Sequence, residues 1–241
     1  MILYDGLDKN IGNFVDFAPD CFSTPFFTPE YCEHLIKLSE ECGIKEQDHG
    51  DYNLLIHNLE GGEEICKSWL STIEEYIEPK IIEKYSYAIK YKSDTINYDN
   101  NTASDEIPSD AYESRCWNGY SVPFIKKYSK ETQRQLTYHW DCSLLTIYMK
   151  LNDKYTGMTT VFPRQNWNNS NMKVGELAIW PSLTHPHYVE KIKSGIKYSF
   201  VGRAGILSPR NDECDNIRKL YSLKDEKKYE LHSENLKKGT G

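Results

Sequence analysis

The second half of the chain consists of short runs of apolar, β-branched and aromatic residues. These runs occupy residues 124–128, 144–151, 159–162, 176–180 and 197–201. Turn-forming pairs such as Asn152-Asp153 and Ser194-Gly195 separate them. Short apolar runs divided by turn residues are typical of antiparallel strands in an all-β unit. We therefore expect a strand-rich core.

The first half carries helix signals instead. Residues 29–43 are amphipathic, with Thr28 as a candidate N-cap and Gly43 at the end. A second helix is expected over about 62–85, and Pro79 should kink it or divide it. Helices followed by strands predict an α+β, mainly β fold, a barrel or sandwich with its N-terminal helices packed on one sheet.

A chain of 241 residues is long enough for one domain with a sizeable core. We expect a single domain over 1–210, with a helical part at 20–92 and the strand core at about 120–205. Residues 93–122 are rich in Asp, Asn and Ser, which predicts a long loop or insertion. Residues 211–241 are expected to be a charged tail in which Lys and Glu interleave.

Composition narrows the classes of function. The formal net charge of −7 argues against a protein that binds nucleic acid through its phosphates. The seven cysteines include no CxxC pair, which argues against a zinc knuckle or a redox dithiol. We see neither a signal peptide nor a membrane-spanning run. We expect a soluble, cytoplasmic protein with no nucleic-acid or membrane partner, and the oligomeric state stays open.

Two histidine motifs carry the chemistry. In the first, His139-Trp140-Asp141, residues two apart on a strand point to the same face. His139 and Asp141 could then bind one metal ion, and Trp140 should point away from it. Two histidines and one carboxylate leave three octahedral positions open, as in non-haem Fe(II) oxygenases. His-x-Asp alone is a weak signal, so the interpretation depends on a third ligand.

The second motif, Thr184-His185-Pro186-His187, supplies that ligand. His187 precedes Lys197 by ten residues, and a Ser-Gly turn lies between them. A hairpin there would bring Lys197 into the cavity of His187, where its charge could pair with the far carboxylate of a metal-chelating dicarboxylate. Ser199, on the same strand face, could add a hydroxyl donor. His185 is the rival ligand, but the offset to Lys197 favours His187.

Together the motifs resemble the 2-oxoglutarate/Fe(II)-dependent dioxygenase superfamily, in its prolyl/lysyl hydroxylase branch. The residues that carry the likeness are His139, Asp141, His187 and Lys197. The likeness to the catalytic domain of procollagen lysyl hydroxylases spans about Phe22 to Arg203 and includes residues 31–43, 53–59, 76–79, 124–128, 145–147 and 183–187. The chain departs from those enzymes at Lys197, where many have arginine, and in its short Thr156-Gly157-Met158 stretch.

The resemblance implies a double-stranded β-helix (jelly-roll) core supported by the N-terminal helices. It implies that Fe(II) binds His139, Asp141 and His187, and that 2-oxoglutarate and O2 take the open positions. Lys197 would anchor the far carboxylate of 2-oxoglutarate, and Tyr128 and Tyr148 would line its pocket. Ascorbate is expected as a further cofactor.

The resemblance also implies an activity, the hydroxylation of an unactivated C–H bond. A lysyl or prolyl side chain in a peptide or protein is the expected substrate. Two alternatives stay open. One is a hydroxylase of a free amino acid or other small molecule, and the other is a non-catalytic, cupin-like module that binds a metal or ligand.

Overall fold

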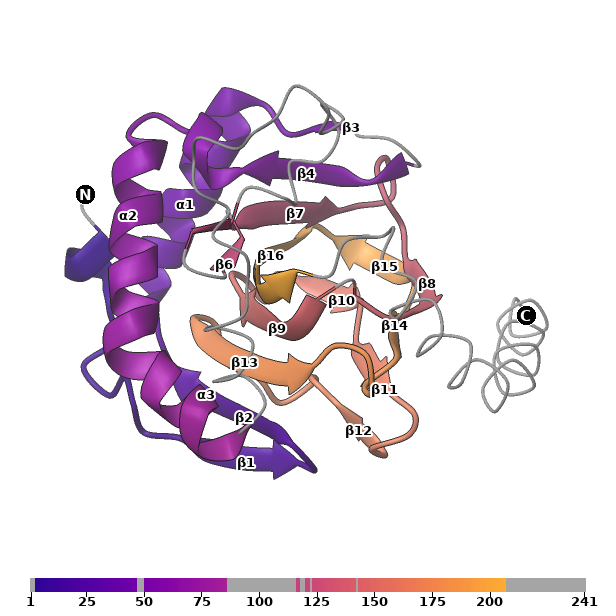
Figure 1. Cartoon of the computed structure of the whole chain (residues 1–241). Helices are drawn as coiled ribbons and strands as arrows, with labels where there is room; N and C mark the ends of the chain where they lie inside the picture. The colour runs from indigo at the N-terminus through magenta and orange to yellow at the C-terminus, as the bar shows by residue number, and fades with distance from the viewer. Residues whose placement is uncertain are drawn as a thin grey trace, which may run out of the picture.

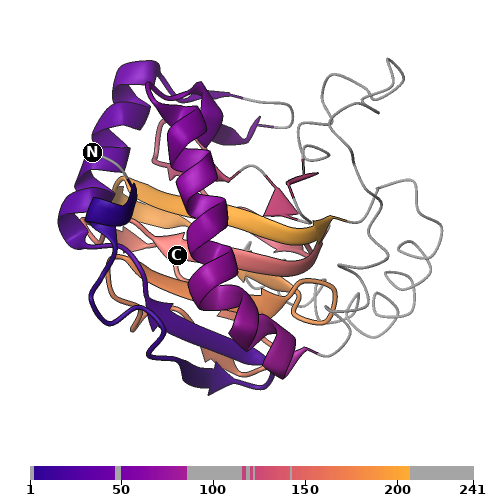
Figure 2. The ribbon, with the colours of Figure 1, turned by 60° about the vertical axis from the view of Figure 1, so that its left-hand side comes forward.

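The computed structural model describes residues 3–46, 50–85, 116–117, 120–121, 123–141 and 143–206. Two β-sheets form the body of this part of the chain, and helices cover one face of the larger sheet (Figures 1 and 2). The helical segments are η1 (Leu3–Gly6), α1 (Pro29–Cys42), η3 (Ile56–Asn58), α2 (Gly62–Thr72), η4 (Ile73–Ile77) and α3 (Glu78–Lys84). The predicted order, helices before most of the strands, is confirmed.

The larger sheet is antiparallel and mixes strands from both halves of the chain. In spatial order its strands are β1 (Val15–Ala18), β2 (Cys21–Pro25), β13 (Glu176–Pro181), β9 (Ser143–Lys150), β16 (Lys197–Ile206), β7 (Phe124–Tyr128), β4 (Tyr52–Leu55) and β3 (Lys45–Glu46). Two short strands extend it beside β16, namely β6 (Tyr120–Ser121) and β5 (Cys116–Trp117). They lie within the segment predicted as a loop, and the rest of that segment, like the predicted tail at 211–241, lies outside the described residues.

The smaller sheet faces the larger one across a cavity. Its strands, in spatial order, are β12 (Trp167–Asn168), β11 (Thr160–Phe162), β14 (His187–Val189) and β8 (Leu136–His139). A separate two-stranded pair joins β10 (Tyr155–Gly157) to β15 (Ile192–Gly195). Two facing antiparallel sheets of this kind form a sandwich whose interior can hold a ligand.

Helix α1 begins and ends where the sequence predicts. The Thr28 hydroxyl accepts a hydrogen bond from the backbone N–H of Tyr31, which caps the first turn. Gly43 follows the last turn with φ 87°, a conformation that favours glycine, and its N–H donates to the carbonyl of Ser39. From this helix, Tyr31 and Leu35 point into the core and are buried between the helix and the larger sheet.

The second helix is interrupted at the predicted place. A π-helical turn, η4, separates α2 from α3 just before Pro79. Proline has no N–H to donate and its ring clashes with the carbonyl four residues earlier, so a regular α-helix cannot run through it. Ile65, Trp69 and Ile73 still share one buried face across the interruption.

Strand β16 separates the apolar core from the site. Phe200, on its outer face, is buried against Trp69 of α2 with a ring-centroid distance of 4.8 Å. Residues on its inner face, from Lys197 to Arg203, line a cavity between the sheets. Side chains alternate along a strand, so one element contributes to both regions. Among the described helices none is both long enough and apolar enough to cross a membrane.

Candidate active site

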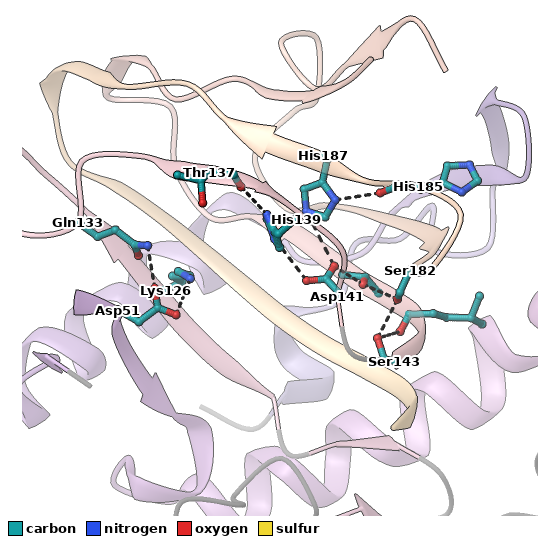
Figure 3. Close-up of polar contacts among 12 residues, drawn as sticks. Asp51, Lys126, Gln133, Thr137, His139, Asp141, Ser143, Ser182, His185 and His187 are labelled. Carbon is teal, nitrogen blue, oxygen red and sulfur yellow. Dashed lines mark hydrogen bonds and ion pairs between the residues drawn. The ribbon is translucent and has the colours of Figure 1, made fainter. Parts of the chain in front are cut away.

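Three predicted ligands converge at the end of the smaller sheet. His139 is the last residue of β8 and His187 the first of β14, and the two are direct partners across this antiparallel pair. Asp141 follows in the connection to β9. One potential ligand atom from each residue lies within 4.8 Å of the others. The Nε2 atoms of His139 and His187 lie 3.6 Å and 3.9 Å from the two Asp141 carboxylate oxygens (Figure 3).

Hydrogen bonds fix which histidine nitrogens face the aspartate. Nδ1 of His139 lies 2.7 Å from the carbonyl oxygen of Thr137, and Nδ1 of His187 lies 3.0 Å from that of His185 (Figure 3). A carbonyl oxygen only accepts, so each Nδ1 carries the proton. In the neutral rings the lone pairs are then on Nε2, which is the arrangement of metal-bound histidines.

The charge states also suit a metal. Burial, with a smaller effect of His139, lowers the pKa of His187 to about 4, so this ring is neutral at pH 7. Burial alone would raise the pKa of Asp141, but the neighbouring imidazoles of His139 and His187 and the positive charge of Arg203 outweigh burial and hold that pKa well below its usual range. Two imidazoles and one carboxylate fit the ligand set of non-haem Fe(II).

His185, the rival ligand, is held by other contacts. Its Nε2 lies 2.9 Å from the carbonyl oxygen of Pro19, and its Nδ1 lies 2.9 Å from the Thr184 hydroxyl. Both ring nitrogens are therefore used within the protein. The histidine contributes to the cluster through its backbone, because its carbonyl accepts the Nδ1 proton of His187.

A cavity of about 160 Å³ adjoins the three ligands between the two sheets. All four residues predicted to bind 2-oxoglutarate line it, namely Lys197, Ser199, Tyr128 and Tyr148. Lys197 of β16 lies directly opposite Tyr128 of the neighbouring strand β7. Ser199 donates a hydrogen bond of 3.3 Å to the Tyr148 hydroxyl. The structure thus brings the predicted residues to one cavity.

Lys197 is a buried cation, only 1% exposed. Its Nζ donates to the carbonyl of Met158 at 2.9 Å and lies 5.6 Å from the ring centroid of Tyr128. Burial, reinforced by the charges of Lys150 and Lys126, lowers the pKa of Lys197 to about 7. None of the ion pairs within the described part of the chain involves Lys197. A buried charge is costly without a counter-ion, so an anionic ligand fits this position.

Two details of the predicted geometry are wrong. Strand β8 ends at His139, so Asp141 reaches the cluster from the connection that follows and not from the same strand. His187 and Lys197 are not hairpin partners, because β14 belongs to the smaller sheet and β16 to the larger one. Strand alternation no longer applies beyond the strand end, which explains the first error. Trp140, which follows that strand end, is among the residues that line the cavity.

Several residues that line the cavity were not predicted from the sequence. Lys126 forms an ion pair of 3.1 Å with Asp51, whose other oxygen accepts a hydrogen bond of 2.7 Å from Gln133 (Figure 3). Arg203 lines the cavity from the far end of the β16 inner face. The two-residue period from Tyr128 could have identified Lys126, whereas Asp51 carries no signal in the local sequence.

Comparisons with known proteins extend these observations. No family model matches the chain. It is 24% identical over 215 residues to the procollagen lysyl hydroxylase and glycosyltransferase of Acanthamoeba polyphaga mimivirus, and 27% identical over 197 residues to procollagen-lysine,2-oxoglutarate 5-dioxygenase 2 of Mus musculus. These alignments cover 80% and 75% of the chain but only 21% and 23% of the relatives. The chain therefore spans less than a quarter of the length of these curated relatives.

A solved structure supports the fold. The viral collagen prolyl hydroxylase of Paramecium bursaria Chlorella virus-1, in its 2OG complex, superposes with a TM-score of 0.51 at 14% identity. The superposition covers 78% of this chain and 97% of the viral protein. At this identity the likeness concerns the fold alone, and it confirms the predicted jelly-roll core.

Proposed function

We propose that the chain is a 2-oxoglutarate/Fe(II)-dependent oxygenase of the prolyl/lysyl hydroxylase branch and that it hydroxylates a side chain of a peptide. The metal would be held by His139, Asp141 and His187. The observation that carries this proposal is that both histidines direct Nε2 toward the carboxylate while each Nδ1 proton is held by a backbone carbonyl. The names of the relatives make a lysyl side chain the first substrate class to test, and a prolyl side chain the second.

In this proposal the protein binds and orients the metal, the cosubstrate and the substrate, and it excludes water from the site. When bound, Fe(II) and 2-oxoglutarate supply the oxidising chemistry, with O2 as the oxidant, succinate and CO2 as coproducts and ascorbate as a further cofactor. Lys197 would pair with the far carboxylate of 2-oxoglutarate, since it is the buried cation of the cavity that no described ion pair engages. Lys126 is less suited to that role because Asp51 already pairs with it. Tyr128, Tyr148 and Ser199 would complete the pocket.

A small-molecule substrate is the second candidate. It is favoured by Arg203, which lies on the cavity wall at the opposite end of the β16 inner face from Lys197. Arg203 of β16 lies directly opposite Thr146 of the neighbouring strand β9, and the Thr146 hydroxyl contacts Asp141. A guanidinium beside the metal ligands could bind the carboxylate of a free amino acid.

The test is succinate formation from 2-oxoglutarate by purified protein with Fe(II) and ascorbate. Lysine-containing peptides, proline-containing peptides, free lysine and free proline form the four substrate arms. Stimulation by a peptide supports the first proposal, and stimulation by a free amino acid alone supports the second. Asp141→Ala should abolish turnover, and His34→Ala, outside the cluster, should leave it unchanged. Absence of turnover together with absence of metal-dependent 2-oxoglutarate binding would favour the non-catalytic alternative.

A further inference from the structure

A row of buried hydroxyl groups leads away from the Asp141 carboxylate. Thr146 Oγ1 donates to Asp141 Oδ2 at 2.5 Å. The Ser182 hydroxyl lies 2.8 Å from that of Thr146, and the Ser143 hydroxyl lies 2.8 Å from that of Ser182 (Figure 3). Ser143 and Ser182 are 0% exposed and Thr146 is 2% exposed. We call Thr146, Ser182 and Ser143 the hydroxyl row.

The carboxylate sets the direction of these hydrogen bonds. An ionised Asp141 can only accept, so the single hydroxyl proton of Thr146 points to it. Thr146 must then accept from Ser182, and Ser182 in turn from Ser143. Ser143 also lies 3.1 Å from the carbonyl oxygen of Leu145, which can share its proton. The hydroxyl donors of Thr146 and Ser182 therefore point toward the aspartate.

The hydroxyl row connects the two chain segments that carry the predicted ligands. Ser143 and Thr146 belong to β9, which begins two residues after Asp141. Ser182 directly follows β13 and precedes His187 by five residues. The backbone N–H of Ser182 also donates to the carbonyl of Leu144 at 2.9 Å. The orientation of the carboxylate is thus linked to the start of the segment that leads to the third ligand.

We propose that Thr146, supported by Ser182 and Ser143, is a positioning residue that holds the Asp141 carboxylate in the orientation in which it binds the metal. This inference rests on the metal site of the proposed function. Asp141 lies beyond the end of β8, so strand pairing does not fix its side chain. The Thr146 hydrogen bond is the described contact that orients Oδ2, leaving Oδ1 toward Nε2 of His139 at 3.6 Å.

A purely structural role makes a different prediction. Buried hydroxyls usually bond to one another simply to satisfy their hydrogen bonds, and removing one then lowers the stability of the fold. A positioning role also lowers metal affinity. Loss of a group that orients a metal ligand typically costs 10–100-fold in affinity. Metal affinity of the folded protein therefore separates the two roles.

The experiment is calorimetric titration of Co(II), which resists oxidation by air, into the full chain, with the visible spectrum of bound Co(II) as a second readout. Thr146→Val keeps the shape but removes the hydroxyl, and we expect it to bind Co(II) about 10–100-fold more weakly with an altered spectrum. Thr146→Ser should restore both. Ser182→Ala leaves Thr146 in place, so we expect a smaller loss. The matched control is Thr72→Val, because Thr72 is equally buried in α2 and bonds only to a helix carbonyl.

The outcomes are distinguishable. If the unmodified chain binds no Co(II), the proposed metal site fails and the inference fails with it. If the unmodified chain binds Co(II) and Thr146→Val binds it equally well, only the inference is overturned. Should Thr146→Val not fold, by circular dichroism, Ser182→Ala decides: weaker Co(II) binding supports the positioning role, and unchanged binding overturns it.

Discussion

The Nζ atom of Lys197 carries a charge that is costly to bury, and the same charge would bind an anion. Nζ is enclosed by aromatic rings and a single carbonyl, and burial lowers the pKa of Lys197 to about 7. Unfolding restores the ordinary pKa near 10.5. Between these values the unfolded chain binds more protons than the folded one, so the stability of the ligand-free protein should rise with pH from about 7 to about 10.

Replacing this lysine should separate stability from function. Lys197→Met keeps the length of the side chain and removes the charge, and exchanging a buried charge for an apolar group is often neutral or stabilising by about 1–4 kcal/mol. We therefore expect Lys197→Met to melt no lower than the unmodified protein at pH 7, yet to bind 2-oxoglutarate at least about tenfold more weakly. Differential scanning fluorimetry and calorimetry measure the two effects. Unchanged affinity would remove Lys197 from the cosubstrate site.

The affinity for 2-oxoglutarate should also depend on pH. The anion pairs with the protonated amine, so affinity in the presence of Co(II) should be constant below about pH 7 and fall by up to about tenfold per unit above it. Lys197→Arg is the matched control, because a guanidinium keeps its charge over this range and should give a flat profile. Calorimetry between pH 6 and 8.5 makes the comparison. Parallel slopes for the two proteins would assign the pH dependence to another group.

At the scale of elements, what could be predicted was local. Strand β7 coincides with the predicted run, and α1 has the expected Thr28 cap, because alternation and capping act within a few residues. Strand pairing is not local. Gly195 was assigned to a hairpin between β14 and β16, but it closes β15 onto β10, and the chain then crosses to the other sheet. Only contacts between distant segments determine that choice.

The same limit applies to the candidate site. The sequence predicted His139, Asp141, His187 and Lys197 as a set, and the structure brings them to one cavity. It did not predict Ser182, which meets Thr146 only because β13 lies beside β9. Residues that support a ligand from a neighbouring strand have no spacing pattern of their own.

Gly157 should matter more than a glycine of similar backbone conformation whose surroundings are open. Its φ is 78°, and an added Cβ would lie 2.4 Å from the carbonyl oxygen of Lys191 on the facing segment. The next residue, Met158, supplies the carbonyl that binds Lys197. We expect Gly157→Ala to cost about 2–4 kcal/mol, from backbone strain plus overpacking, and to weaken 2-oxoglutarate binding as well.

The matched control for this prediction is Gly12→Ala. Gly12 has φ 89°, but nothing lies within 4 Å of the position that an added Cβ would take, so the substitution introduces strain without a clash. It should cost only about 1 kcal/mol and leave ligand binding unchanged. Thermal melts and calorimetry test both variants. Equal losses of stability in the two variants would mean that the segment around Lys191 shifts to make room for the added Cβ without a further loss of stability.

For the whole molecule, charge is distributed unevenly. The chain carries a net charge of −7, yet Lys126, Lys197 and Arg203 all line the cavity. Two carboxylates, Asp51 and Asp141, share that lining. A dianionic cosubstrate is therefore attracted by the cavity in spite of the overall charge, and added salt should weaken its binding less than for an exposed site.

The described part of the site lies within a limited stretch of the chain. Every described residue that lines the cavity falls between Asp51 and Arg203, and β16, the last of the described strands, lies in the middle of the larger sheet and ends at Ile206. We propose that residues 1–210 form the folded domain and that residues 211–241 are a tail that the site does not require. A chain ended at Arg210 should then unfold in one transition and bind metal as the full chain does.

Ligand-linked stability provides the measurement. A ligand at one hundred times its dissociation constant stabilises the state that binds it by about 2.7 kcal/mol. For a domain of this size that corresponds to roughly 5–10 °C in melting temperature. Co(II) at the same free concentration should raise the melting temperature of the full and shortened chains equally, and His187→Ala should abolish the increase in both. A smaller increase in the shortened chain alone would show that residues beyond Arg210 contribute to the metal site, because the lost stabilisation would have no other source.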